Sequence, residues 1–175
     1  VQTCALPISL CDTCKLFGSP YAASRIFFSD LYPPEDDAIA DRMIQVRDGV
    51  AINRDSEKAE DRLKYDYEVV AAAQVFDLKI TLEDPTELDL ALTCMGLSEF
   101  VSGMAYLGGN RSRGLGNCKI EDLIIYRLDL TAVDNAERGE RLKRYLLGRT
   151  LEEKMEKVSD PEGFLEDQIM NLPAL

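Results

Sequence analysis

Alternating apolar and polar residues predict strands in the middle of the chain. Between residues 43 and 52 the apolar residues Ile44, Val46, Val50 and Ile52 fall on one side, as in a strand with one buried face. Similar alternation covers residues 65–69 and 76–82, and a longer run extends from Ile120 to Leu130. The nearly all-polar segment Asn53–Lys64 is expected to protrude as a loop or a flexible hairpin tip.

Elsewhere the spacing of apolar residues changes to that of amphipathic helices. Asp84 is a candidate N-cap, Pro85 suits the first helical position, and Gly108 and Gly109 would end this helix. Three further helices are predicted, starting near Asp134, Thr150 and Asp160. The expected fold is α+β, a ferredoxin-like or RRM-like βαββαβ palm that lacks its first strand, followed by a helical C-terminus.

Composition narrows the classes of function. The chain has 175 residues, 46% of them apolar, and a net charge of −12, which predicts one globular domain. No apolar run approaches the roughly 18 residues that a membrane span needs, so no membrane partner is expected. The absence of histidine excludes histidine-based catalysis and metal binding. Five cysteines without a repeated spacing favour a reducing, cytoplasmic compartment.

The stretch "GGNRSRGLGNCKI" is the most informative part of the sequence. The total charge argues against a nucleic-acid binder, yet the segment Val101–Ile120 carries three basic residues and no acidic one. Its glycines allow a backbone nest for an anion, and two arginines offer planar guanidinium groups that suit phosphate. An ordinary helix-to-strand turn with solvated arginines is the other interpretation. The candidate residues are Gly108, Gly109, Arg111, Arg113, Gly114 and Gly116.

Two further groups of residues leave alternatives open. In the polar protrusion and its flank, Arg47, Arg54 and Arg62 either contact a ligand or belong to a solvated loop. Tyr65 and Tyr67 point to the same side of their strand, where they either stack on nucleobases or join the core.

The cysteines offer only part of a metal site. Cys11 and Cys14 form a CxxC pair, but a structural zinc ion takes four ligands. A redox motif would need a preceding strand, and none is evident. Cys94 falls on the apolar stripe of its helix and is expected in the core, whereas Cys118 could be buried or exposed.

Three stretches in order resemble the RAMP superfamily of repeat-associated proteins. They are "CDTCKLFGSPYAASRIFFSD", "VRDGVAINRDSEKAEDRLKYDYEVV" and "GGNRSRGLGNCKI". The nearest resemblance is to the backbone subunit of type III CRISPR effector complexes. It implies an RRM-like palm, a thumb-like hairpin that wedges into a guide RNA–target duplex, and a glycine-rich loop that holds the guide RNA. The implied partners are guide RNA, target RNA, other effector subunits and copies of the chain itself.

The resemblance also implies what this chain lacks. Family members cleave target RNA with a divalent metal and an aspartate that follows their first strand, and no residue here matches that aspartate. Some members hold zinc near the position of Cys11 and Cys14 with ligands further upstream. Arg25, in the "SR" after the "FGSP" signature, is a further candidate for RNA contact.

The start of the chain suggests its domain organisation. Residues 1–9, "VQTCALPIS", resemble the translation of a sequencing adapter and are expected to be a foreign leader on a truncated fragment. Residues 10–130 would then be the truncated RRM-like domain, and 131–175 a helical extension. A metal-dependent endoribonuclease and a generic RRM-like interaction module are the alternative functions.

Overall fold

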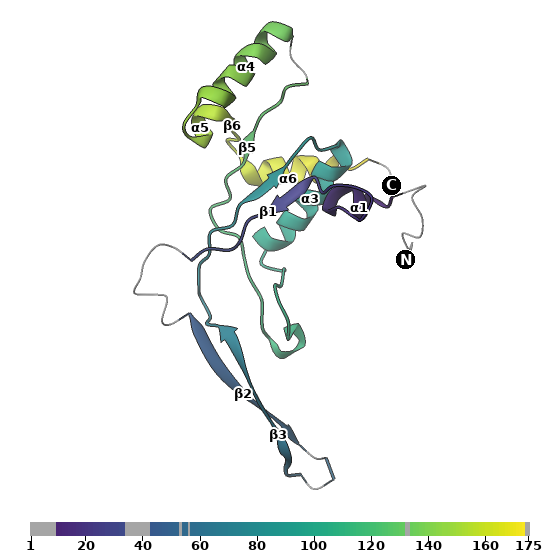
Figure 1. Cartoon of the computed structure of the whole chain (residues 1–175), viewed down its shortest axis with the longest axis vertical. Helices are drawn as coiled ribbons and strands as arrows, with labels where there is room; N and C mark the ends of the chain where they lie inside the picture. Colours follow the sequence, from purple (N-terminus) through teal and green to yellow (C-terminus); the bar gives the residue numbers. More distant parts are fainter. Residues whose placement is uncertain (1–9, 34–42, 53, 56, 132–133, 174–175) are drawn as a thin grey trace. The chain divides into compact units, whose positions relative to one another are not determined.

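A computed structural model describes residues 10–33, 43–52, 54–55, 57–131 and 134–173 as a mixed α+β chain, which confirms the expected class (Figure 1). The helical elements are α1 (Asp12–Phe17), α3 (Glu87–Val101), η1 (Arg111–Arg113), α4 (Asn135–Leu147), α5 (Leu151–Lys154) and α6 (Pro161–Met170). The strands are β1 (Ile26–Phe28), β2 (Ile44–Ile52), β3 (Ala59–Val70), β4 (Ile80–Leu82), β5 (Tyr126–Arg127) and β6 (Glu156–Lys157). The predicted leader, residues 1–9, lies outside the described residues.

Contacts divide the chain into two compact units. The strand unit is Ile26–Glu83, and the helical unit combines Val1–Arg25 with Asp84–Leu175. In the strand unit, β1 and β4 pair antiparallel, with Ile26 opposite Leu82. Along the chain this pair follows α1 and precedes α3, so the order helix, strand, strand, helix is that of the middle of a βαββαβ unit.

A long hairpin is inserted between the two strands of this pair. β2 and β3 form a separate antiparallel sheet, in register from Ile44 opposite Val70 to Val50 opposite Lys64. Of the two expectations for Asn53–Lys64, the hairpin tip is confirmed, but the tip is shorter than expected because β3 already begins at Ala59. The side chains of this hairpin are largely exposed, so its strands need no regular alternation of polar and apolar residues.

Two other predicted strands are shorter than their alternation indicated. The run at 76–82 is reduced to β4, and the run Ile120–Leu130 is reduced to β5, which pairs with β6 through Tyr126 opposite Lys157. Asp122 adopts a left-handed backbone conformation, with φ at 54°, and this interrupts an extended strand. The alternation of polar and apolar residues therefore predicted an extended segment here, but most of that segment does not pair with another strand.

Helix α3 begins and ends at other residues than predicted. Asp84 has φ at 43° and cannot act as the N-cap. Thr86 caps the helix instead, in a capping box in which its hydroxyl accepts from the N–H of Asp89 at 3.2 Å. The helix ends at Val101, before the left-handed Gly103 (φ 73°), and therefore well before Gly108.

The predicted starts of the three C-terminal helices are confirmed. Asp134 accepts a hydrogen bond from the N–H of Glu137 at 2.8 Å at the start of α4. Thr150 forms a capping box with Glu153 at the start of α5. Asp160 caps α6 by accepting from the N–H of Gly163 at 3.0 Å. Each of these contacts spans three residues, so the local sequence is sufficient to specify it.

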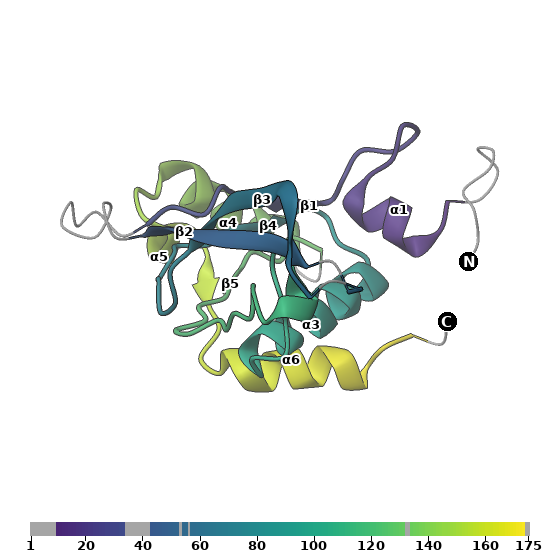
Figure 2. The same ribbon diagram turned by 90° about the horizontal axis from the view of Figure 1, so that it is seen from below.

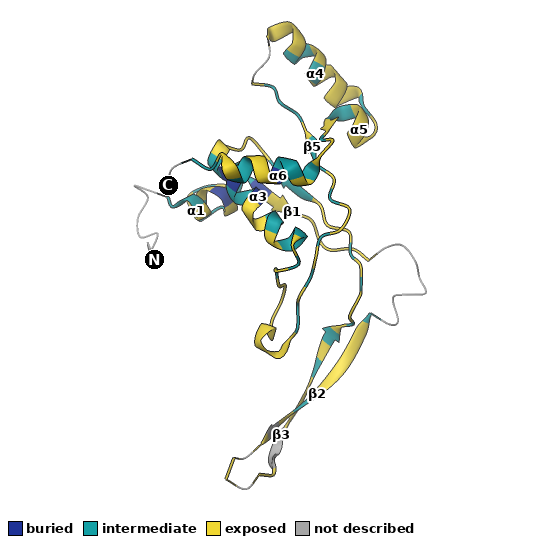
Figure 3. Ribbon diagram, turned by 180° about the vertical axis from the view of Figure 1, so that it is seen from behind, coloured by how far each residue is buried: buried dark blue, intermediate teal, exposed yellow. Residues whose placement is uncertain are grey.

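The core of the helical unit includes the contact between α3 and α6. Figures 2 and 3 show α6 alongside α3. Its most buried apolar side chains are Leu16, Ala91, Cys94 and Leu165, each no more than 3% exposed. The acidic C-terminal segment thus supplies a helix that covers α3 of the same chain.

Cys94 is a core residue, as its place on the helical stripe predicted. Its side chain is buried, and burial raises the pKa of its thiol to about 11. A rise of two pKa units lowers the thiolate fraction at neutral pH roughly 100-fold, so native Cys94 is expected to resist alkylation. Mass spectrometry after brief iodoacetamide treatment should find the half-buried Cys118 alkylated first, and both thiols alkylated in urea. Equal labelling of both in the native protein would contradict the packing.

Candidate nucleic-acid interface

The glycine-rich loop is a closed structure with a short antiparallel neck. The N–H of Leu107 donates to the carbonyl of Gly116 at 2.8 Å, and the N–H of Cys118 donates to Ala105 at 3.2 Å. The side chain of Asn117 adds a bond to the carbonyl of Gly103 at 2.9 Å. The neck begins just after α3, so the helix fixes where the tip of the loop starts.

The tip is a turn of 3-10 helix that carries both candidate arginines. Asn110 precedes it in a left-handed conformation (φ 56°) and Gly114 follows it with φ at 78°. Arg111, Ser112 and Arg113 are all exposed. No sequence pattern singled out Asn110, although asparagine is among the non-glycine residues that most readily adopt this conformation.

Three backbone N–H groups at the tip donate inside the turn, and an anion nest formed by the other N–H groups of the loop stays a prediction. The N–H of Arg113 donates to Asn110 at 2.9 Å, and the N–H of Gly114 donates to Arg111 at 3.0 Å. The N–H of Leu115 also donates to Asn110, at 3.4 Å. Because these three groups already donate inside the turn, the exposed guanidinium groups of the tip are the stronger candidates for contact with phosphate.

The glycines of the loop have different structural roles. Gly108, Gly114 and Gly116 have positive φ, whereas Gly109 does not have this conformation. A methyl group on Gly116 would overlap the carbonyl of Leu107, the very residue that closes the neck. At Gly108, Gly109 and Gly114 a methyl group would meet open space.

The hairpin carries the second set of predicted contact residues. Arg47 on β2 and Arg54 near the tip are exposed, while the side chain of Arg62 lies outside the described residues. Tyr65 is 45% exposed, and its ring lies nearly parallel to that of Tyr67, with 6.1 Å between centroids. Tyr65 is therefore not a core residue, and Tyr67 beside it is half-buried.

Arg25 is engaged inside the helical unit. Its Nη1 donates to Oδ2 of Asp89 at 2.8 Å, and Asp89 is only 3% exposed. The "FGSP" stretch positions it: after Gly18 (φ 85°) the chain turns back, and the N–H of Arg25 reaches the carbonyl of Leu16 at 3.0 Å. Contact between Arg25 and RNA stays a prediction, and the geometry gives this side chain a structural partner.

The CxxC pair lies at the start of the short helix α1. Cys11 is its N-cap residue and Cys14 lies within it; both are half-buried, and neither is in a disulfide. Among the residues that the structure describes, no three histidine, cysteine or acidic side chains gather as metal ligands would. Two thiols alone do not complete a zinc site, so zinc binding here stays a prediction.

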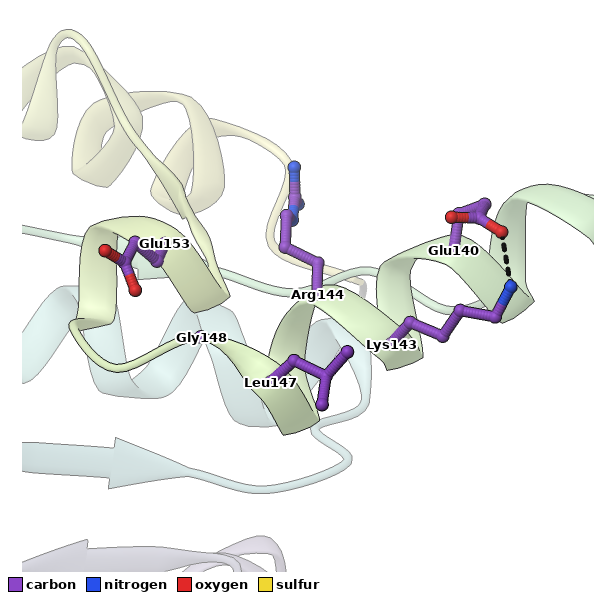
Figure 4. A pocket seen from close by; sticks show the side chains of 6 residues that line it. All are labelled: Glu140, Lys143, Arg144, Leu147, Gly148 and Glu153. Atoms are coloured by element: carbon purple, nitrogen blue, oxygen red, sulfur yellow. Dashed lines mark hydrogen bonds and ion pairs between the residues drawn. The ribbon is translucent and has the colours of Figure 1, made fainter.

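A shallow hollow between α4 and α5 does not resemble a substrate site. Figure 4 shows it lined by Glu140, Lys143, Arg144, Leu147, Gly148 and Glu153. The Lys143 ammonium is paired with Glu140 at 2.7 Å. Charges of both signs lie around an open surface, so the hollow favours neither a cationic nor an anionic ligand.

Comparison with known proteins gives the family. The model of the RAMP superfamily matches residues 3–119, which include α1, the hairpin, α3 and the whole glycine-rich loop. No curated protein matches the chain. None of the helices in the described ranges is both long and apolar enough to cross a membrane. RAMP proteins are CRISPR-associated modules that bind RNA. Because the family model covers well over half of its length, the chain belongs to the RAMP superfamily.

Proposed function

We propose that this chain is a guide-RNA-binding backbone subunit of a type III CRISPR effector complex. The observation that carries the proposal is the tip of the glycine-rich loop, where Arg111 and Arg113 are exposed on a turn held by a hydrogen-bonded neck. Arginine presents a rigid fork of donors that suits phosphate oxygens. A protruding cationic tip on an otherwise acidic chain concentrates phosphate binding at one place.

Exposed apolar side chains support assembly with other subunits. Phe27 and Phe28 of β1 are 46% and 56% exposed, and Leu146 and Leu147 at the end of α4 are 73% and 80% exposed. Large exposed apolar groups are typical of surfaces that bind other proteins. Copies of the chain and other effector subunits are the proposed protein partners, and guide RNA with its paired target RNA is the proposed ligand.

Replacing both tip arginines with alanine should weaken RNA binding. We expect Arg111→Ala with Arg113→Ala to raise the Kd for single-stranded RNA roughly tenfold to a hundredfold, because two charge-assisted phosphate contacts are lost. The slope of log K against log salt should become shallower by between about 1.4 and 2. Fluorescence anisotropy over a salt series measures both quantities.

The matched control is the double variant Lys143→Ala with Arg144→Ala on α4. It removes the same number of positive charges, but these two side chains already pair with Glu140 and Glu156. The control should bind RNA with nearly the affinity of the original chain. Equal losses in the two double variants would show that only net charge matters and would overturn the assignment of the loop.

A further inference from the structure

The two faces of the β2–β3 hairpin differ in chemistry. Residues directly opposite each other in the register share a face. One face, which we name the aromatic face, carries Gln45, Arg47, Gly49, Tyr65, Tyr67 and Val69. The other, the acidic face, carries Ile44, Val46, Asp48, Val50, Lys64, Asp66, Glu68 and Val70.

On the aromatic face, the two tyrosine rings form one surface. A methyl group at Gly49 would overlap the ring of Tyr65, so this ring lies directly across the glycine of the neighbouring strand. Tyr67 comes two residues later on the same strand, and its ring plane is inclined by only 27° to that of Tyr65. The Tyr65 ring thus packs against Gly49 of the neighbouring strand, while Tyr65 is still 45% exposed.

Charge is segregated between the faces. Arg47 is exposed directly opposite Tyr67 and is the cation of the aromatic face, which bears no acidic residue between positions 45–49 and 65–69. The acidic face carries Asp48 opposite Asp66, with Lys64 near them at 3.6 and 3.9 Å, and Glu68 one pair further along. A polyanion is therefore repelled by one face and meets arginine and aromatic rings on the other.

From this arrangement we infer that the aromatic face is a stacking platform for unpaired bases of single-stranded RNA. The rings of Tyr65 and Tyr67 receive the bases, and Arg47 contacts the neighbouring phosphate. Proteins that bind single strands combine stacking aromatics with cations in this way, and stacking tolerates any base because each has a π-face. The inference rests on the proposed function and specifies which side of the hairpin meets RNA.

Removing the rings should weaken binding without changing its salt dependence. We expect Tyr65→Leu with Tyr67→Leu to raise the Kd for a short oligouridine by between about 5-fold and 100-fold at constant salt slope, because stacking is lost and charge is unchanged. Tyr65→Phe with Tyr67→Phe keeps the rings and should bind like the original chain. Val46→Thr, on the acidic face of the same hairpin, should also leave binding unchanged, and circular dichroism confirms that each variant is folded.

A second arm removes the bases instead of the rings. An RNA of the same length with abasic sugars should bind the original chain more weakly by the same factor, and the leucine variant should bind both RNAs equally. Full binding of the abasic RNA, full binding by the leucine variant, or loss in the phenylalanine variant would overturn the platform. Failure of the proposed function gives a different result, namely no RNA binding by the original chain, or no effect of the Arg111 and Arg113 substitutions.

Discussion

Replacing Arg25 with alanine is expected to lower the free energy of unfolding by about 2–4 kcal/mol, because it leaves a buried carboxylate without its cation. Asp89 is 3% exposed and accepts from Arg25 Nη1 at 2.8 Å, from Thr86 Oγ1 at 2.7 Å and from the N–H of Thr86 at 3.0 Å. Urea denaturation monitored by circular dichroism at neutral pH measures the loss.

Two matched variants separate the buried charge from other effects of truncation. Lys143→Ala breaks an ion pair whose side chains are 66% and 72% exposed, and it should cost less than about 0.5 kcal/mol. Adding Asp89→Asn to Arg25→Ala removes the stranded charge and should restore part of the stability, since the amide oxygen can still accept from Thr86. A double variant no more stable than Arg25→Ala alone would refute this account.

The same variant should show a weaker dependence of stability on acid. Burial would raise the pKa of Asp89, but hydrogen bonds from Thr86 and Arg25 and the charge of Arg25 together lower it below its usual value. A lowered pKa contributes stability that is present above the unfolded value of about 3.9 and is lost as pH falls through the folded value. The stability gap between the original chain and Arg25→Ala should therefore narrow as pH falls below about 4, measured by urea midpoints over a pH series.

How much the sequence predicts depends on how local the interaction is. The helix starts at Asp134, Thr150 and Asp160 were predicted correctly, because each capping bond joins residues three positions apart. The lengths of the strands were not predicted correctly, because a strand forms only where a second strand pairs with it. The alternation of polar and apolar residues does not identify that second strand. The sequence contained no sign that Ile120–Leu130 would be interrupted at Asp122, and β1 was not predicted at all.

The candidate site was also predicted only where its properties depend on the local sequence. The chemistry of the loop could be read from "GGNRSRG", since it depends on which residue types are present. The direction of the loop's N–H groups could not be predicted, because it depends on the hydrogen bonds that Arg113 and Leu115 donate to the carbonyl of Asn110. Likewise Arg25 looked like a cation available to RNA, whereas its partner Asp89 lies 64 residues further along the chain.

Gly116→Ala is expected to open the neck of the glycine-rich loop, with a cost of about 2–4 kcal/mol in unfolding free energy and a loss of RNA affinity like that of the double arginine variant. Gly116 has φ at 83°, where a side chain is strained, and a methyl group there would displace the carbonyl of Leu107. That shift would break the 2.8 Å bond from Leu107 N–H to the Gly116 carbonyl, and the tip would lose its fixed position.

The other loop glycines provide a graded set of controls for this effect. Gly114→Ala meets the strain of a positive φ (78°) but no steric overlap, so about 1 kcal/mol is expected. Gly109→Ala introduces neither backbone strain nor steric overlap, so its unfolding free energy should lie within about 0.5 kcal/mol of that of the original chain. Urea denaturation and RNA anisotropy on all three variants should rank Gly116 as most damaging, then Gly114, then Gly109. If Gly116→Ala matches Gly109→Ala in both measurements, the neck does not hold the tip, and the arginines act without a fixed support.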